Sequence, residues 1–427
     1  MDRASKSNVK HANRPEPLGF VYFGLVLFMI VSFVHPQDWI PGLAAVPLAK
    51  ITGILTLLAL VFSFNDIRWH MPQEVAFLSL LMVQLWLTVP FSPVWRGGAF
   101  NVMLNFSRIL PFVVAIYGAV RSMKRLRSVL FVQAASIATI SLISIVTRHT
   151  SDGRLQGVLS GVGNSNDLAL ALDLSLPLCL AFAITTRSFW KKFAWSIAMF
   201  AMVYAVFLTA SRGGAIAFVV AALVCLWQLG VKSRRFYLVL LVPVAVMVIG
   251  LYGGNSLRGR FMQTNLEPAT NNHSTEEDAS GQQRKELLFQ SLKVTAQHPL
   301  FGVGPGNFEI VSGVWRVTHN SYTQMSSEGG IPAFLLYVLF LWRGIANLRD
   351  VSKSAERGKG IRPFSMALGA SLAAYLVGSF FTSVAYQLFP YCLVAYTSAL
   401  RLIVQKDRTG SPKPQPTPTE VEATVWQ

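Results

Sequence analysis

The chain has 427 residues, of which 52% are apolar and only 13% are charged. Soluble domains carry about 25% charged residues, so this composition excludes a chain made only of water-soluble domains. The formal net charge of +17 fits either a nucleic-acid-binding protein or a polytopic membrane protein with Lys and Arg collected in its cytoplasmic loops. The positions of the basic residues decide between these two classes.

Apolar runs recur along the chain at the length of about 20 residues that a helix needs to cross a bilayer. They predict about twelve transmembrane helices. The runs are 18–34, 43–64, 74–91, 101–120, 128–147, 167–186, 193–210, 213–231, 236–252, 330–347, 363–383 and 386–404. No small-residue cleavage site closely follows the first run, so we interpret it as a retained helix and not as a signal peptide.

The basic residues indicate the orientation of these helices. Most of the 37 Lys and Arg residues fall in segments that share one side of the membrane when both termini are cytoplasmic. This distribution explains the net charge, and we therefore predict no nucleic acid partner. The predicted plan is a cytoplasmic leader at 1–17, helices one to nine at 18–252, a periplasmic loop with the catalytic residues at 253–328, helices ten to twelve at 329–404 and a disordered cytoplasmic tail at 405–427.

The loop at 253–328 is long, and loops of this length are usually functional. Residues 267–278 are predicted to be polar coil. Residues 282–296 are predicted to form an amphipathic helix with Leu288 and Leu292 on one face. The predicted fold class is an all-α polytopic membrane protein with about twelve transmembrane helices and one large periplasmic loop.

Arg212 is the first candidate functional residue, because an ionisable side chain at the membrane edge is costly and is a functional hypothesis by default. It lies in Thr209-Ala-Ser-Arg-Gly-Gly214, between two apolar runs with almost no loop. The glycines allow close approach of backbone or ligand, and a guanidinium can bind phosphate through two parallel hydrogen bonds. The alternative is an interfacial arginine that snorkels to lipid headgroups.

Four further residues are candidates on position alone. Arg284 begins the predicted loop helix, where a solvated helix start is the alternative reading. His319 lies near the tenth apolar run and can exchange a proton near neutral pH, although two other histidines share its loop. Lys50 and Arg108 lie within the second and fourth runs, where they either attract phosphate or snorkel to the headgroups.

Three motifs narrow this choice. Ser211-Arg-Gly, then Arg284-x-x-x-Leu288, then His319-Asn320 with a downstream glycine resemble, in order and spacing, the O-antigen ligase and polymerase superfamily. In the ligases of that family the third motif is His-Asn/Ser/Gln, nine residues, Gly, two residues and Gly/Thr/Tyr. Gly330 stands at its expected place, whereas Ala333 departs from the last position. Segments 163–168 and 302–308 also look like segments of the family.

The resemblance implies a GT-C-like, inverting glycosyltransferase that needs no metal and no cofactor. Such an enzyme moves a glycan from undecaprenyl pyrophosphate to an acceptor hydroxyl at the periplasmic face of the bacterial inner membrane. Arg212 and Arg284 would clamp the pyrophosphate, and His319 would orient or deprotonate the acceptor hydroxyl. The implied substrate-binding residues are Ser211, Asn320, Lys50 and Arg108, with Asn320 as a candidate to hold the imidazole ring.

Several acceptors and one other class of protein remain open. Lipid A–core is the acceptor of a ligase, whereas a polymerase extends the glycan on its own lipid carrier, and a third version attaches glycan to protein. Segment 36–42 looks like the start of some exopolysaccharide-associated members. A secondary transporter also has about twelve helices, but transporters place their sites near the midplane between repeated halves, and this chain shows no repeat.

Overall fold

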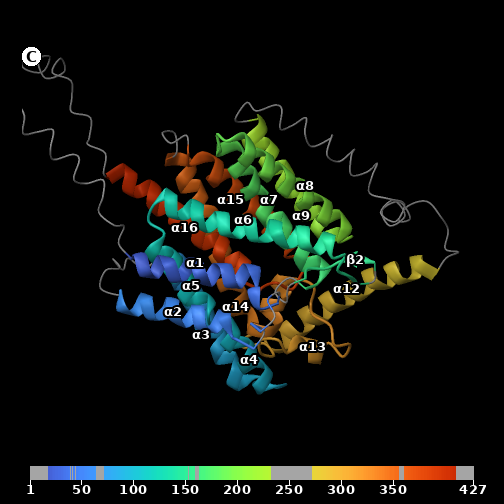
Figure 1. Ribbon diagram of the computed structural model, residues 1–427. Coiled ribbons are helices and arrows are strands. Elements are labelled where there is room, and N and C mark those ends of the chain that lie inside the picture. Colours follow the sequence, from blue (N-terminus) through green and yellow to red (C-terminus); the bar gives the residue numbers. More distant parts are fainter. Residues whose placement is uncertain are drawn as a thin grey trace, which may run out of the picture.

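The computed structural model describes residues 18–38, 40, 42–43, 45–63, 72–151, 153–158, 163–231, 272–354 and 360–409. These residues form a bundle of helices (Figure 1). The elements are α1 (Gly19–Val34), η1 (Pro36–Asp38), α2 (Leu48–Phe62), α3 (Gln73–Phe91), α4 (Arg96–Phe106), α5 (Ile109–Ala119), α6 (Met123–Val146), β1 (Thr150–Ser151), β2 (Arg154–Leu155), α7 (Ser165–Thr185), α8 (Phe189–Leu208), α9 (Arg212–Cys225), the π-helical turn η4 (Leu226–Val231), α12 (Asn272–Gln297), α13 (Phe308–Val311), α14 (Ser321–Ser354), α15 (Arg362–Gly378) and α16 (Leu388–Thr409). Strands β1 and β2 pair antiparallel.

Eight helical segments of the described chain are long and apolar enough to cross a membrane. They are Gly19–Asp38, Gln73–Phe91, Arg96–Ala119, Met123–Val146, Ser165–Thr185, Phe189–Leu208, Ser321–Lys353 and Leu388–Lys406. Leu48–Phe62 and Arg212–Gln228 are shorter apolar helices. The predicted all-α polytopic fold is thus confirmed. The number twelve stays a prediction, and the predicted ninth helix at 236–252 lies outside the described residues.

Helix α7 lies inside the bundle, where α6, α8, α9 and α15 pack against it. Its sequence is apolar on all sides, which is typical of a helix that is buried all round and not of one with a single core-facing stripe. Helix α8, by contrast, has large exposed side chains such as Phe189 and Trp190. The amino terminus of α7 is therefore held firmly from several directions, and the candidate site is built around it.

The predicted fourth helix, 101–120, is two helices that meet at Ser107-Arg108. Pro111 explains the break, because its ring collides with the carbonyl group four residues earlier in a continuous helix and it has no N–H to donate. Ser107 stabilises the turn. Its hydroxyl donates to the carbonyl oxygen of Met103 at 2.7 Å and accepts from the indole N–H of Trp86 at 2.9 Å.

Helix α12 confirms the predicted loop helix but corrects two of its details. It begins at Asn272, so residues 272–278 are helical and not the coil that we predicted. Its buried face consists of Leu287, Ser291 and Val294, whereas Leu292 is 48% exposed. The predicted Leu288/Leu292 face is wrong by one residue, a rotation of about 100°, because the packing partners are Val303 and Phe308 of the following segment.

Helix α14 is broken at Gly330, whose φ of 79° is not helical. The break frees carbonyl groups, and in a membrane protein non-helical backbone must find partners within the protein. The segment after α12 supplies them. Val303 N–H donates to the Ser327 carbonyl at 2.9 Å, and Gly304 N–H donates to the Glu328 carbonyl at 2.9 Å.

Three further hydrogen bonds, made by two side chains, complete this contact between segment 300–306 and the broken part of α14, which we call the seal. The Gln84 side-chain amide of α3 donates to the carbonyl oxygens of Leu300 and Gly329 at 2.7 and 3.2 Å. The buried Glu328 carboxylate accepts from the N–H of Gly306 at 2.9 Å. Segment 302–306, part of the stretch noted for its resemblance to the family, is therefore the partner of the helix break.

Gly302 tests this contact. A Cβ atom at Gly302 would lie 2.4 Å from the Glu328 carbonyl carbon, and φ there is +58°. Gly313 has a similar φ of +70° with nothing within 4 Å, so Gly313→Ala is the matched control for backbone strain of about 1–2 kcal/mol. We expect Gly302→Ala to lower Tm in detergent clearly more than the control. Equal shifts would show that the close contact is unimportant.

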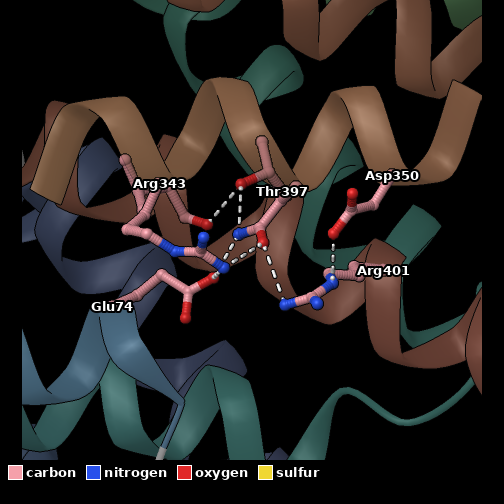
Figure 2. A network of polar contacts seen from close by, with 7 residues as sticks. Glu74, Arg343, Asp350, Thr397 and Arg401 are labelled. Atoms are coloured by element: carbon pink, nitrogen blue, oxygen red, sulfur yellow. Dashed lines mark hydrogen bonds and ion pairs between the residues drawn. The ribbon is translucent and has the colours of Figure 1, made fainter.

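A network of polar side chains joins three helices at the end of α3 far from this seal (Figure 2). Asn347 of α14 donates to Glu74 of α3 and to Thr397 of α16. Arg343 Nη2 lies 3.8 Å from Glu74 Oε1. Glu74 and Asn347 are almost fully buried, so the network fixes α3, α14 and α16 to one another where water does not screen the charges.

The buried part of this network should matter more than its exposed part. Glu74→Ala leaves a largely buried arginine without its partner, and losses of this kind reach about 3–5 kcal/mol. The matched control is Asp350→Asn, which breaks the 3.0 Å ion pair to Arg401 between side chains that are 45% and 31% exposed and should cost less than about 1 kcal/mol. Tm measurements of both variants check this. A larger effect of Asp350→Asn would contradict it.

Candidate active site

Arg212 is the first residue of α9, directly after the corner that joins α8 to α9. Ala210 takes a left-handed conformation with φ of 47°, which turns the chain sharply. Ser211 then caps α9, because its hydroxyl accepts from the Gly214 N–H at 3.1 Å. This local geometry leaves the Arg212 side chain exposed at the start of the helix.

The two glycines after Arg212 serve close packing. A Cβ at Gly213 would lie 2.3 Å from the Cβ of Phe381, and one at Gly214 would lie 2.5 Å from the Cβ of Ala169. Only glycine lets the first turn of α9 press against both α7 and the connection between α15 and α16. The close approach that the sequence indicated is thus a contact between parts of the protein.

A hydrogen-bonded cluster surrounds the same corner. Asn166 Oδ1, in the first turn of α7, accepts from Ser211 Oγ at 2.8 Å and from Arg154 Nη2 at 3.0 Å. Arg154 Nε also donates to the Thr209 carbonyl at 2.9 Å. Asn166 belongs to segment 163–168, which was noted for its resemblance but assigned no role. Arg154 had no sequence signal beyond its charge.

His319 lies just before α14 with a left-handed φ of 52°. The side chains on either side hold the backbone there. Thr318 Oγ1 contacts Ser383 Oγ at 2.9 Å, and Asn320 Oδ1 accepts from the N–H groups of Tyr322 and Thr323 at 2.9 and 3.2 Å. Asn320 therefore caps α14 through its side-chain oxygen, and its role in holding the imidazole ring stays a prediction.

The connection between α15 and α16, residues 379–387, fixes the start of α14. This role was not predicted from the sequence. Ser321 N–H donates to the Ser379 carbonyl at 2.8 Å, and Ser321 Oγ donates to the Thr382 carbonyl at 2.7 Å. Ser321 Oγ also accepts from the Val384 N–H at 3.0 Å. Because small polar residues in a loop have no characteristic pattern, only the tertiary structure identifies this anchor.

The three predicted catalytic residues are brought together. Burial and then the positive charge of Arg212 lower the pKa of Arg284. Burial, then Arg284, then Arg316 lower the pKa of His319 to about 4. Each residue thus lies within the electrostatic range of the next, although α9, α12 and the segment before α14 are far apart in sequence. His319 is neutral at neutral pH.

The structure places the other two predicted residues differently. Lys50 is exposed in the first turn of α2. Arg108 lies at the break between α4 and α5, where its guanidinium donates to Asn105 Oδ1 at 2.6 Å. Neither Lys50 nor Arg108 is among the described charged residues that shift the pKa of Arg284 or of His319. A substrate-binding role for Lys50 and Arg108 stays a prediction.

Residues 197–338, from α8 into α14, match the family model described as O-antigen ligase. This range contains Arg212, Arg284 and His319. The match supports the resemblance of this region of the chain to the O-antigen ligase and polymerase superfamily. No curated protein matches it. The family assignment supports a glycosyltransferase-like membrane enzyme with a lipid-linked glycan and an acceptor as its partners.

The lowered pKa of His319 is open to direct measurement. Arg316→Gln removes a positive charge that disfavours the imidazolium, so we expect the pKa to rise above about 4. The pH dependence of His319 modification by an acylating reagent, located by mass spectrometry, reports this value. Lys293→Gln, which removes an exposed charge from α12, should leave it unchanged.

The same pKa has a consequence for stability. Unfolded histidine titrates near 6.5, so between this value and about 4 the unfolded state binds more protons than the folded state at this position. His319 therefore lowers the stability of the fold as pH falls through that interval.

A His319 pKa that stayed unchanged in the Arg316→Gln variant would contradict the electrostatic arrangement described here.

Proposed function

We propose that this protein is a ligase-type glycosyltransferase that moves a glycan from undecaprenyl pyrophosphate to an acceptor hydroxyl, such as one on lipid A–core. In this proposal the site faces the periplasm, the chain lies in the bacterial inner membrane and both termini are cytoplasmic. The observation that carries it is the gathering of Arg212, Arg284 and His319 from three separate elements, with the electrostatic coupling that links them.

The arginines suit a pyrophosphate leaving group. Burial and then the positive charge of Arg212 lower the pKa of Arg284, and a polyanion bound between the two guanidinium groups relieves their repulsion. Arginine binds phosphate oxygens through paired, charge-assisted hydrogen bonds. The negative charge on the leaving group grows as the glycosidic bond breaks, so the same contacts strengthen in the transition state.

The neutral imidazole of His319 suits the acceptor. The acceptor hydroxyl passes its proton to the imidazole as its oxygen bonds to the anomeric carbon. The bond from that carbon to the phosphate oxygen breaks, and its electron pair leaves with the pyrophosphate. A bound pyrophosphate also places negative charge near His319, which raises its pKa and makes it a stronger base. One displacement of this kind inverts the anomeric carbon.

Substitution of the three residues tests the proposed function. In detergent, with a polyprenyl-pyrophosphate-linked oligosaccharide and purified lipid A–core, Arg212→Ala, Arg284→Ala and His319→Ala should each lower the transfer rate by roughly 10²- to 10³-fold. Lys285→Ala removes the exposed charge next to Arg284 and is expected to transfer normally. Normal turnover by Arg212→Ala and His319→Ala would refute this site.

Deletion in the native host identifies the acceptor. Loss of all long chains from lipid A–core, with accumulation of lipid-linked polymer, is the result expected of a ligase. Single repeat units on an intact core would indicate a polymerase instead. An unchanged lipopolysaccharide ladder with exopolysaccharide missing, or with protein glycosylation lost, would move the assignment to another acceptor within the same chemistry.

A further inference from the structure

We propose that Arg154 and Asn166 are positioning residues that hold Arg212 in place for the pyrophosphate. This inference rests on the proposed function and adds to it two residues outside the three catalytic motifs. Neither is assigned to contact the substrate. Each acts on Arg212 through Ser211 and the α8–α9 corner.

The hydrogen bonds around Asn166 have a defined direction. Arginine has N–H donors and no acceptor, so the 3.0 Å contact with Arg154 Nη2 requires the oxygen of the Asn166 amide at that place. The same oxygen contacts Ser211 Oγ at 2.8 Å, and the serine must therefore donate its only hydrogen. Both acceptor sites of Asn166 Oδ1 are then filled.

Ser211 is fixed as a result. Its hydrogen points to Asn166, and its lone pairs accept the Gly214 N–H at 3.1 Å. Arg212 directly follows Ser211 and lies within the turn that the Ser211–Gly214 hydrogen bond closes. The direction in which the Arg212 side chain leaves α9 is thus set by a cap that is itself held from α7.

Arg154 ties the other side of the corner. Its guanidinium reaches the Thr209 carbonyl through Nε at 2.9 Å while Nη2 holds Asn166. One planar group thereby bridges the end of α8 and the start of α7. Its partner Thr209 comes directly before Ala210, which has the left-handed φ of 47°. Lysine has no such rigid planar fork and therefore cannot hold both acceptors in this fixed arrangement.

The corner has little freedom to move in other directions. Gly213 and Gly214 leave no gap to Phe381 and Ala169, so the first turn of α9 is enclosed on those sides. The Arg154–Asn166–Ser211 chain adds directed hydrogen bonds to these contacts. Because catalytic groups lose about 100-fold in rate when displaced by about 1 Å, loss of this chain should impair transfer without unfolding the protein.

The test is a double-substitution cycle on the full-length protein in detergent, with the polyprenyl-pyrophosphate-linked oligosaccharide and lipid A–core as substrates. Asn166→Ala should lower kcat/KM for the donor about 10-fold or more. Asn166→Asp, which keeps an oxygen acceptor, should restore most of it. In an Arg212→Lys background, Asn166→Ala should have little further effect, because residues that act through one another are not additive.

Two variants complete the design. Asn164→Ala removes the cap of α7, whose side chain accepts from the Asp167 N–H at 2.8 Å. It lies two residues from Asn166 and should lower Tm with kcat/KM unchanged. Arg154→Gln breaks the same hydrogen-bond chain at its other end. It should lower kcat/KM as Asn166→Ala does, and its effect should also vanish in the Arg212→Lys background. If one of the two variants folds poorly, the other still provides the test.

The outcomes separate the two proposals. Multiplicative effects of Asn166→Ala and Arg212→Lys, or a lowered Tm with normal kcat/KM in both Asn166→Ala and Arg154→Gln, would overturn the positioning role alone. Normal transfer by Arg212→Lys and Arg212→Ala would overturn the proposed function, and the positioning role with it. Loss of kcat/KM that Asn166→Asp rescues, and that vanishes in the Arg212→Lys background, supports the inference.

Discussion

The connection between α15 and α16 holds the two halves of the candidate site at a fixed separation. On one side its backbone binds Ser321, and so fixes the start of α14 next to His319. On the other side Phe381 packs against Gly213, beside Arg212. Gln387 extends the contact to Asp167 of α7 at 3.1 Å. Arg212 and His319 therefore share one support, although more than one hundred residues separate them in the chain.

A second constraint comes from the need to satisfy every backbone group near the membrane. Helix α14 gives up its regular hydrogen bonds at Gly330, and segment 302–306 replaces them. The long loop is thus a structural partner of the helix that follows it. Arg284 precedes segment 302–306 in the chain, and His319 lies between that segment and the break at Gly330, so the contact that satisfies the backbone also orders the chain around both residues.

Sequence reasoning succeeded where a physical cost limits the choices. Charges at the membrane edge are rare, so Arg212 stood out, whereas the order and spacing of three motifs selected Arg284 and His319. The structure brings the three residues together. Apolar runs predicted most helices because the bilayer demands them. Sequence reasoning failed where contacts between residues far apart in the chain determine the structure. The buried face of α12 depends on Val303 and Phe308, and Leu288/Leu292 fit a helix equally well. Asn166, Arg154 and Ser383 act through contacts that no local pattern encodes.

Helix α14 is held at both ends by interactions of different kinds. At one end the caps and carbonyl contacts around Ser321 and Gly330 fix it, and at the other Asn347 joins it to the buried carboxylate of Glu74 (Figure 2). A shift by one helical turn is about 5.4 Å and would break both sets at once. The position of His319 along the axis of α14 is therefore determined in part by side chains at the opposite end of the helix.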